Sequence, residues 1–91
     1  MQLKDTVEMM NSDDYKERFK AEYYQTKIRY EKLKKFNNKI EAYGRLPYLS
    51  KNTLDEPKHD CPSDLLRTQQ SAMDEYLHIL EVRAEIENIE L

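Results

Sequence analysis

The chain has 91 residues, of which 38% are hydrophobic and 36% are charged. A chain of this length and polarity forms one small domain with a thin core. It contains one glycine, three prolines and few β-branched residues, which favours helix over sheet. We therefore expect an all-α fold in which residues 1–91 form a single helical domain.

The net charge of -3 is unevenly distributed. Residues 16–39 carry nine basic side chains and three glutamates, whereas residues 74–91 carry six acidic side chains and one cation, Arg83. Two such helices could neutralise each other, or the basic face could stay partly free for an anion. DNA and RNA polymers are poor partners, because counterion release would be small and the acidic helix would repel their backbone. A small anion bound between helices fits better.

Cys61 is the single cysteine, so no disulfide can form within the chain, and a reducing compartment is expected. The first ten residues lack the apolar core of a secretory signal, and no apolar run approaches the length that spans a membrane. These features predict a soluble, intracellular protein without a membrane partner.

In chain order, residues 1–11 form an N-terminal extension, with apolar residues spaced for a short turn of helix. Residues 12–43 predict a long first helix, capped by Asn11 or Ser12 and ended by Gly44. Ala21, Tyr24 and Ile28 form a second apolar patch on another face of that helix. Its main apolar stripe follows the three-four spacing of a buried face: Tyr15, Phe19, Tyr23, Thr26, Tyr30, Leu33, Phe36, Ile40 and Tyr43.

Residues 44–61 predict a connector that is partly ordered through Leu46, Tyr48, Leu49 and Leu54. Residues 62–88 predict a second helix that begins near Pro62. Its stripe consists of Leu65, Leu66, Gln69, Ala72, Met73, Tyr76, Ile79, Leu80, Arg83 and Ile86.

The two helices are expected to pack as a long antiparallel hairpin. The expected register places Leu66 near Phe36, Tyr76 near Thr26, and Arg83 near Phe19. A two-helix hairpin has only one shared face, so much of its apolar surface stays uncovered. Association of several hairpins into a helical-bundle homo-oligomer, a dimer or higher, would cover this surface.

No motif indicates an enzyme, because the chain has no glycine-rich phosphate loop, no HExxH and no cysteine and histidine set at metal-ligand spacing. His59, Asp60 and Cys61 lie close together in sequence, but His78 is the only further candidate ligand, which does not complete the ligand set of a metal site. We expect no catalytic residue, no metal and no cofactor.

Tyrosines alternate with arginines and lysines along the first helix. Such rings can pack in a core, or they can stack on nucleobases while guanidinium groups bind phosphates. Arg83 is a cation on an apolar stripe. Either a salt bridge to Glu22 or Glu85 or a bound phosphate would account for it.

Three segments of the chain resemble parts of a known protein family: YKERFKAEY, KIRYEKLKKF and LLRTQQSAMDEYLHILEVRAEIENIEL. Over residues 15–36 and 65–91, the chain resembles a family of small bacteriophage proteins known as relatives of a crAss-like phage protein. The resemblance implies a phage accessory protein that acts in the host cytoplasm against host immunity. Similar small helical oligomers act as sponges, which sequester cyclic-oligonucleotide or cyclic ADP-ribose immune signals without cleaving them.

Under this interpretation, the ligand is a small anionic nucleotide bound between helices of different subunits. The alternative is a helical protein-binding module that inhibits a host defence protein through the Ala21, Tyr24 and Ile28 patch. A purely structural oligomer is a third possibility. From the geometry of the stripes, the candidate phosphate ligands are Arg18, Arg29 and Arg83, and the candidate stacking residues are Tyr15, Tyr23 and Tyr76.

Overall fold

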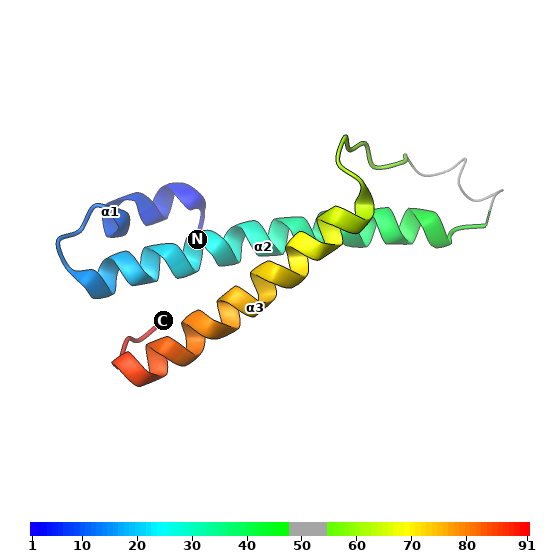
Figure 1. Cartoon of the computed structure of the whole chain (residues 1–91). Coiled ribbons are helices and arrows are strands. Elements are labelled where there is room, and N and C mark those ends of the chain that lie inside the picture. Colours follow the sequence, from blue (N-terminus) through cyan, green and yellow to red (C-terminus); the bar gives the residue numbers. More distant parts are fainter. Residues whose placement is uncertain (48–54) are drawn as a thin grey trace.

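The computed structural model describes residues 1–47 and 55–91, in which every regular element is helical. The order is η1 (Leu3–Thr6), α1 (Val7–Met10), α2 (Tyr15–Arg45) and α3 (Ser63–Glu87). Figure 1 shows α2 and α3 running antiparallel, with η1 and α1 folded back along the first half of α2. The all-α prediction and the antiparallel hairpin are confirmed, and a short N-terminal layer is added to them.

Helix α2 begins later than the sequence predicts. The side chain of Asp14 caps it by accepting a hydrogen bond from the backbone N–H of Lys16 at 3.0 Å. The Ser12 hydroxyl instead accepts from the backbone N–H of Asp14, at 3.1 Å. The prediction of Asn11 or Ser12 as the cap is therefore wrong, because those residues lie in the turn that reverses the chain between α1 and α2.

The predicted end of the first helix at Gly44 is also wrong. The helix continues through Gly44 to Arg45, and Gly44 does not adopt the left-handed conformation of a glycine cap. Leu46 then takes an extended conformation. It precedes Pro47, and a residue before proline is sterically disfavoured from the helical region.

Helix α3 lies within one residue of the predicted range at each end. Its last turn closes through Asn88, which adopts the left-handed conformation with φ 56°. This turn brings the backbone N–H of Ile89 to the carbonyl oxygen of Ala84, at 2.8 Å. Ile89 is consequently buried against the hairpin, although it follows the helix.

The core lies between α2 and α3, near the start of the first helix and the end of the second. Contacts along the hairpin confirm the expected register to about one turn. The Arg83 guanidinium lies over the Phe19 ring at 5.1 Å, as expected, whereas Tyr76 reaches Glu22 instead of Thr26. The buried core cluster consists of Phe19, Tyr23, Leu77, Leu80, Ala84 and Ile89.

The predicted stripe on the second helix is wider than the face that α2 covers. Leu77, Leu80 and Ala84 are buried, whereas Leu65, Ile79 and Ile86 of the predicted stripe are exposed. The sequence pattern merged two apolar faces that point in different directions. A single neighbouring helix can cover only one of them.

The N-terminal segment covers the second apolar patch of α2. Ala21 is only 1% exposed, and Thr6 of η1 is fully buried. The Thr6 hydroxyl accepts a hydrogen bond from Gln25 at 2.9 Å and donates one to the carbonyl of Leu3. The expectation that Ala21 belongs to an exposed docking patch is therefore wrong, because the same chain supplies its neighbour.

Only the two ends of the predicted 44–61 connector can be compared with the structure. The expected packing of Tyr48, Leu49 and Leu54 lies outside the described residues. At the described end, the His59 ring meets the Phe36 ring edge-on, with centroids 6.1 Å apart. The chain thus returns to α2 before α3 begins.

Candidate ligand-binding face

A cluster of polar and aromatic groups closes the end of the hairpin where α2 begins and α3 ends. Arg83 donates to the Tyr15 hydroxyl at 2.6 Å and to the Glu87 carboxylate at 3.0 Å. The Tyr15 hydroxyl in turn donates to the other Glu87 oxygen at 2.9 Å. Arg83 also lies over the Phe19 ring, so one ring contact and two hydrogen bonds position its guanidinium.

Two helical turns from Tyr15 and Arg83 along the hairpin, the Tyr76 hydroxyl donates to the Glu22 carboxylate. The side of the hairpin defined by Tyr15, Phe19, Glu22, Tyr76, Arg83 and Glu87 is called the Tyr15–Arg83 face below. The rings of Tyr15 and Tyr76 are partly open to solvent, at 47% and 38% exposure. Both rings therefore have surface left for stacking.

The carboxylates on this face favour the protonated forms of their partners. The hydrogen bond to Glu87 raises the pKa of Tyr15, and the hydrogen bond to Glu22 raises the pKa of Tyr76. Glu87 also raises the pKa of Arg83 above its ordinary value. At neutral pH the face therefore presents neutral phenols around a charged guanidinium.

The Arg83 guanidinium has capacity for an anion. It carries five N–H donors, of which Tyr15 and Glu87 occupy part, and its side chain is 47% exposed. A planar cation stacked on a ring suits bidentate binding of a phosphate. An incoming phosphate would compete with Glu87 for the N–H groups of Arg83. The Lys16 ammonium could add a second positive charge, since it lies 3.3 Å from the carbonyl of Asn88, the residue after Glu87.

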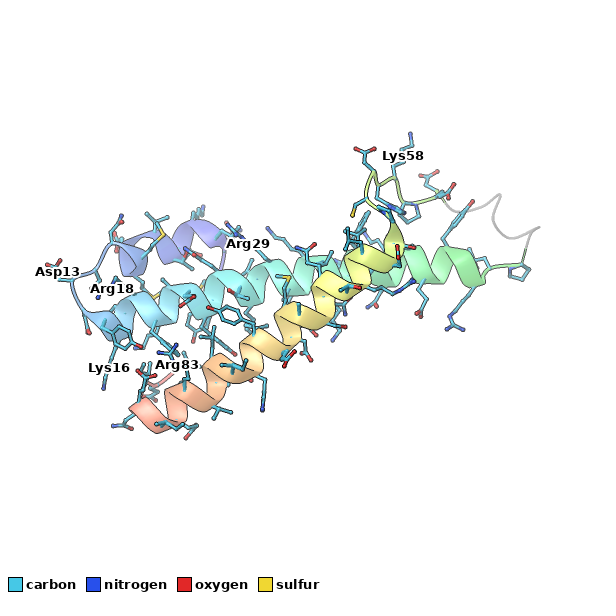
Figure 2. All side chains as sticks on the ribbon, viewed as in Figure 1. Asp13, Lys16, Arg18, Arg29, Lys58 and Arg83 are labelled. Carbon is cyan, nitrogen blue, oxygen red and sulfur yellow. The ribbon has the colours of Figure 1, made fainter. Side chains whose placement is uncertain are left out.

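The structure brings together only three of the six predicted site residues on one face of a single chain: Tyr15, Tyr76 and Arg83. Arg18 donates to the carbonyl of Ser12 at 2.8 Å, in the turn before α2. Arg29 is exposed further along α2, and Figure 2 shows both arginines on the side of α2 near the N-terminal segment, whereas Arg83 lies on α3. Within one chain, neither Arg18 nor Arg29 is part of the Tyr15–Arg83 face.

Tyr23, the remaining predicted residue, lies on the opposite side of the helix pair. It is 4% exposed, and its hydroxyl donates to Glu81 at 2.7 Å. Its ring packs edge-on against Tyr24. Within one chain, Tyr23 acts as a packing residue with a satisfied hydroxyl, so it has no free ring face for a base.

Sequence reasoning missed the carboxylate partners of this face. Glu87 follows Arg83 by four residues, a spacing that pairs side chains on a helix surface and could have identified it. The sequence predicts Glu22 or Glu85 as the salt-bridge partner of Arg83, but the structure pairs Arg83 with Glu87 instead. Glu22 is instead engaged by Tyr76, a contact between helices that a local spacing rule cannot give.

The opposite side of the helix pair contains a groove of about 310 Å³. Its charge disfavours an anion, because the acids Glu31, Asp74 and Glu81 outnumber the single lysine, Lys27. The Lys27 ammonium also lies over the Tyr23 ring, 5.7 Å from its centroid. On the Tyr15–Arg83 face, Arg83 and the nearby Lys16 balance the two acids Glu22 and Glu87, so this face is the better candidate of the two for an anionic ligand.

Burial and the hydrogen bond to Glu81 raise the pKa of Tyr23 to about 12. Because the folded state favours the neutral phenol, the associated stability is present below pH 10 and is lost between about pH 10 and 12. The loss should be on the order of 2 kcal/mol. We expect absorbance at 295 nm to show a late tyrosine ionisation that Tyr23→Phe removes. A late ionisation near pH 12 that keeps its full amplitude in Tyr23→Phe would contradict this assignment.

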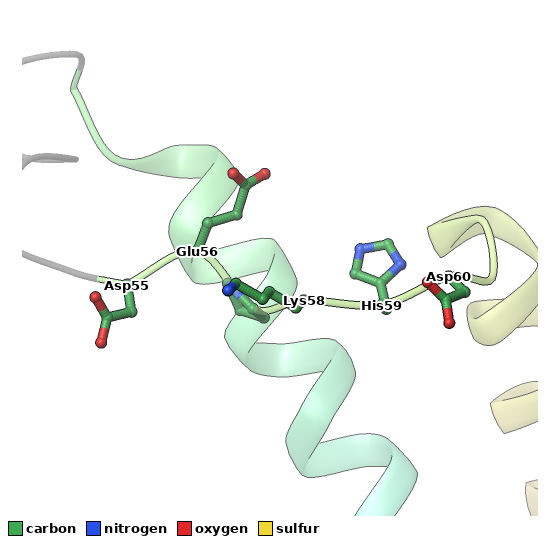
Figure 3. Close-up of a pocket in the computed structure, with 6 residues that line it drawn as sticks. Asp55, Glu56, Lys58, His59 and Asp60 are labelled. Atoms are coloured by element: carbon green, nitrogen blue, oxygen red, sulfur yellow. The ribbon is translucent and has the colours of Figure 1, made fainter.

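The described part of the connector forms an open hollow of about 890 Å³ along residues 55–60 (Figure 3). Its side chains come from consecutive residues of one extended segment and project in different directions. The His59 ring nitrogen is engaged with the carbonyl of Cys61. Among the described residues, no three histidine, cysteine or acidic side chains converge as a metal site would require.

No helix in the described ranges combines the length and apolar character needed to cross a bilayer. Neither the curated proteins nor the solved structures include a match to the chain. The model of the Sequestin family, however, matches residues 13–86. The chain belongs to the Sequestin family.

The Sequestin match spans α2, the connector and most of α3. It includes Tyr15, Tyr76 and Arg83 of the candidate face, while Glu87 lies one residue beyond it. The segment containing η1 and α1 lies outside the match. The shared part is thus the hairpin on which the candidate face is built.

Proposed function

We propose that this chain is a phage counter-defence protein that sequesters a small nucleotide immune signal, of the cyclic-oligonucleotide or cyclic ADP-ribose type, without cleaving it. The observation that carries this proposal is the half-exposed Arg83 guanidinium, which lies over Phe19 and donates to Tyr15, on a face where Tyr15 and Tyr76 are both partly exposed. The family name is consistent with sequestration, although it names no ligand. The resemblance to phage accessory proteins supplies the biological setting, in the host cytoplasm.

The chemistry of such ligands matches the groups on the face. Each nucleotide unit carries a phosphate that a guanidinium can bind in two places and a base that can stack on a phenol ring. One chain supplies Arg83 with Tyr15 and Tyr76, which is enough for about one unit. A ligand with two or three units would therefore require equivalent groups from other chains.

Binding without cleavage is consistent with the state of the acidic groups on this face. Glu22 and Glu87 both accept hydrogen bonds from tyrosines, and Glu87 is also paired with Arg83. A general base must instead be placed against the proton that it removes. The face thus favours holding an anion over activating water.

Direct inhibition of a host defence protein remains the alternative. Docking through the Ala21, Tyr24 and Ile28 patch is disfavoured, because Ala21 is buried beneath the N-terminal segment and the other two residues are only partly exposed. A partner protein could not reach the whole patch without displacing that segment. The polar, half-exposed Tyr15–Arg83 face is a better match for a small anion.

The test is to mix the purified protein with cyclic dinucleotides, cyclic trinucleotides and cyclic ADP-ribose isomers, and to remove the protein by filtration. We expect one member of the panel to be retained in a fixed molar ratio and to be recovered chemically intact after heat denaturation. Calorimetry that shows no binding across the panel would contradict the proposal. Recovery of a cleaved product would contradict sequestration and indicate an enzyme.

A further inference from the structure

The side of α3 that points away from α2 carries an apolar stripe at seven-residue intervals. Leu65, Ile79 and Ile86 are 57%, 47% and 78% exposed, and Ala72, at the fourth position of the repeat, is also exposed. With about 100° per residue, Ile79 lies about 160° around the helix from the buried Leu77. This set of four residues is called the outer stripe below.

Nothing in the described part of the chain covers the outer stripe. The N-terminal segment packs on α2, and Figure 1 shows it on the side of α2 away from α3. The stripe runs most of the length of α3, about 38 Å for 25 residues. Helices that pack along one another have two apolar positions in every seven residues; the outer stripe supplies one of them, and Tyr76 and the 45% exposed Val82 lie at the spacing of the other.

We propose that the outer stripe is the contact surface for a second copy of this chain, with the two α3 helices packed antiparallel about a two-fold axis. The spacing of the stripe is unchanged when the helix is reversed. Leu65 then faces the partner's Ile86, and Ala72 faces the partner's Ile79. The small side chain lies opposite a large one at the inner positions, as interlocking helices require.

Charge favours the antiparallel order over the parallel one. The end of α3 carries Glu81, Glu85 and Glu87, with Arg83 as its single cation. A parallel pair would set this acidic end beside its own copy and would also align the two helix dipoles. The antiparallel pair places it beside the partner's residues 64–70, in which Asp64 and Arg67 cancel, so that repulsion falls and the dipoles oppose each other.

This arrangement would extend the Tyr15–Arg83 face across two chains. Tyr76 and Arg83 border the outer stripe on α3, about 60° and 40° around the helix from Ile79. Tyr76 would lie near the two-fold axis, beside the partner's Tyr76. Arg83 would lie at the level of the partner's Thr68. The apolar stripe would supply the centre of an interface of about 800 Å² on each partner, and these polar residues its rim.

Light scattering should give the wild-type protein a mass twice the 11.0 kDa of one chain at micromolar concentration. Ile79→Glu should give the mass of one chain with unchanged helical circular dichroism, because Ile79 contributes little to the core of the monomer. Val7→Glu is the matched control, since Val7 is similarly exposed at 45% but lies on α1. A single-chain wild-type mass, or a dimer that survives Ile79→Glu, would overturn the proposal.

Crosslinking tests the helix order without relying on a disruptive variant. In a Cys61→Ser background, Ala72→Cys and Ile79→Cys are made as separate proteins. Antiparallel packing predicts disulfide formation only when the two proteins are mixed. In a dimer of one variant, the two introduced cysteines would lie about 10 Å apart along the helix axis. A disulfide needs Cα atoms within roughly 7 Å. Efficient crosslinking of either protein with itself would overturn the antiparallel order. Neither measurement involves a nucleotide, so both are independent of the proposed function.

Discussion

Leu80→Ala should cost about 3 kcal/mol of unfolding free energy. Leu80 is 1% exposed and belongs to the core cluster with Phe19 and Tyr23. Truncating a buried leucine removes its transfer free energy and leaves a cavity, at a typical cost of 2–5 kcal/mol. Because small domains are stable by only about 5–15 kcal/mol, this loss is a large fraction of the total.

Urea unfolding followed by circular dichroism at 222 nm measures this change. Val7→Ala is the control, because Val7 is also an aliphatic residue in a helix but is 45% exposed, and its truncation should cost less than about 0.5 kcal/mol. A loss below 1 kcal/mol for Leu80→Ala would show that α2 and α3 do not pack as described. Equal losses in the two variants would lead to the same conclusion.

The helical architecture was predictable because it depends on local chemistry. A run of about thirty residues without proline or glycine, with apolar groups three and four apart, determines α2 almost completely. The register was also predictable to about one turn, since the antiparallel order pairs the basic start of one helix with the acidic end of the other. The position of Arg83 over Phe19 follows from this register.

The rotation of α3 about its own axis was not predictable from the same pattern. The sequence places Leu80 and Ile79 on one wide apolar stripe, but only Leu80 is buried. A periodicity shows that a face is apolar without showing which neighbour covers it. The same ambiguity affected Ala21, whose neighbour, the N-terminal segment, is too short and too polar to be recognised as a packing layer.

The candidate site was predictable in its residue types but not in its grouping. Arginines and tyrosines alternate along α2, yet Arg18 turns towards Ser12 and Tyr23 towards Glu81. These choices depend on hydrogen-bond partners from other elements, which sequence spacing does not reveal. Only Tyr15, Tyr76 and Arg83 share a face, so the structure reduces six candidates to three within one chain.

Arg83→Gln is expected to weaken nucleotide binding by roughly 10- to 100-fold, because it removes a charged, two-pronged phosphate ligand. Arg83→Lys should be intermediate, since an ammonium keeps the charge but loses the planar fork and its stacking on Phe19. Calorimetry with the ligand that the wild-type protein retains measures both effects. Circular dichroism should show that each variant keeps its helical content.

Arg45→Gln is the matched control for the loss of charge. Arg45 also pairs with a glutamate four positions away on its helix, Glu41, at 3.4 Å, but it lies at the opposite end of α2. Its replacement removes the same charge and the same kind of ion pair without touching the Tyr15–Arg83 face. Equal weakening in both variants would indicate a non-specific charge effect. Full affinity in Arg83→Gln would exclude the face while leaving sequestration itself possible elsewhere on the chain.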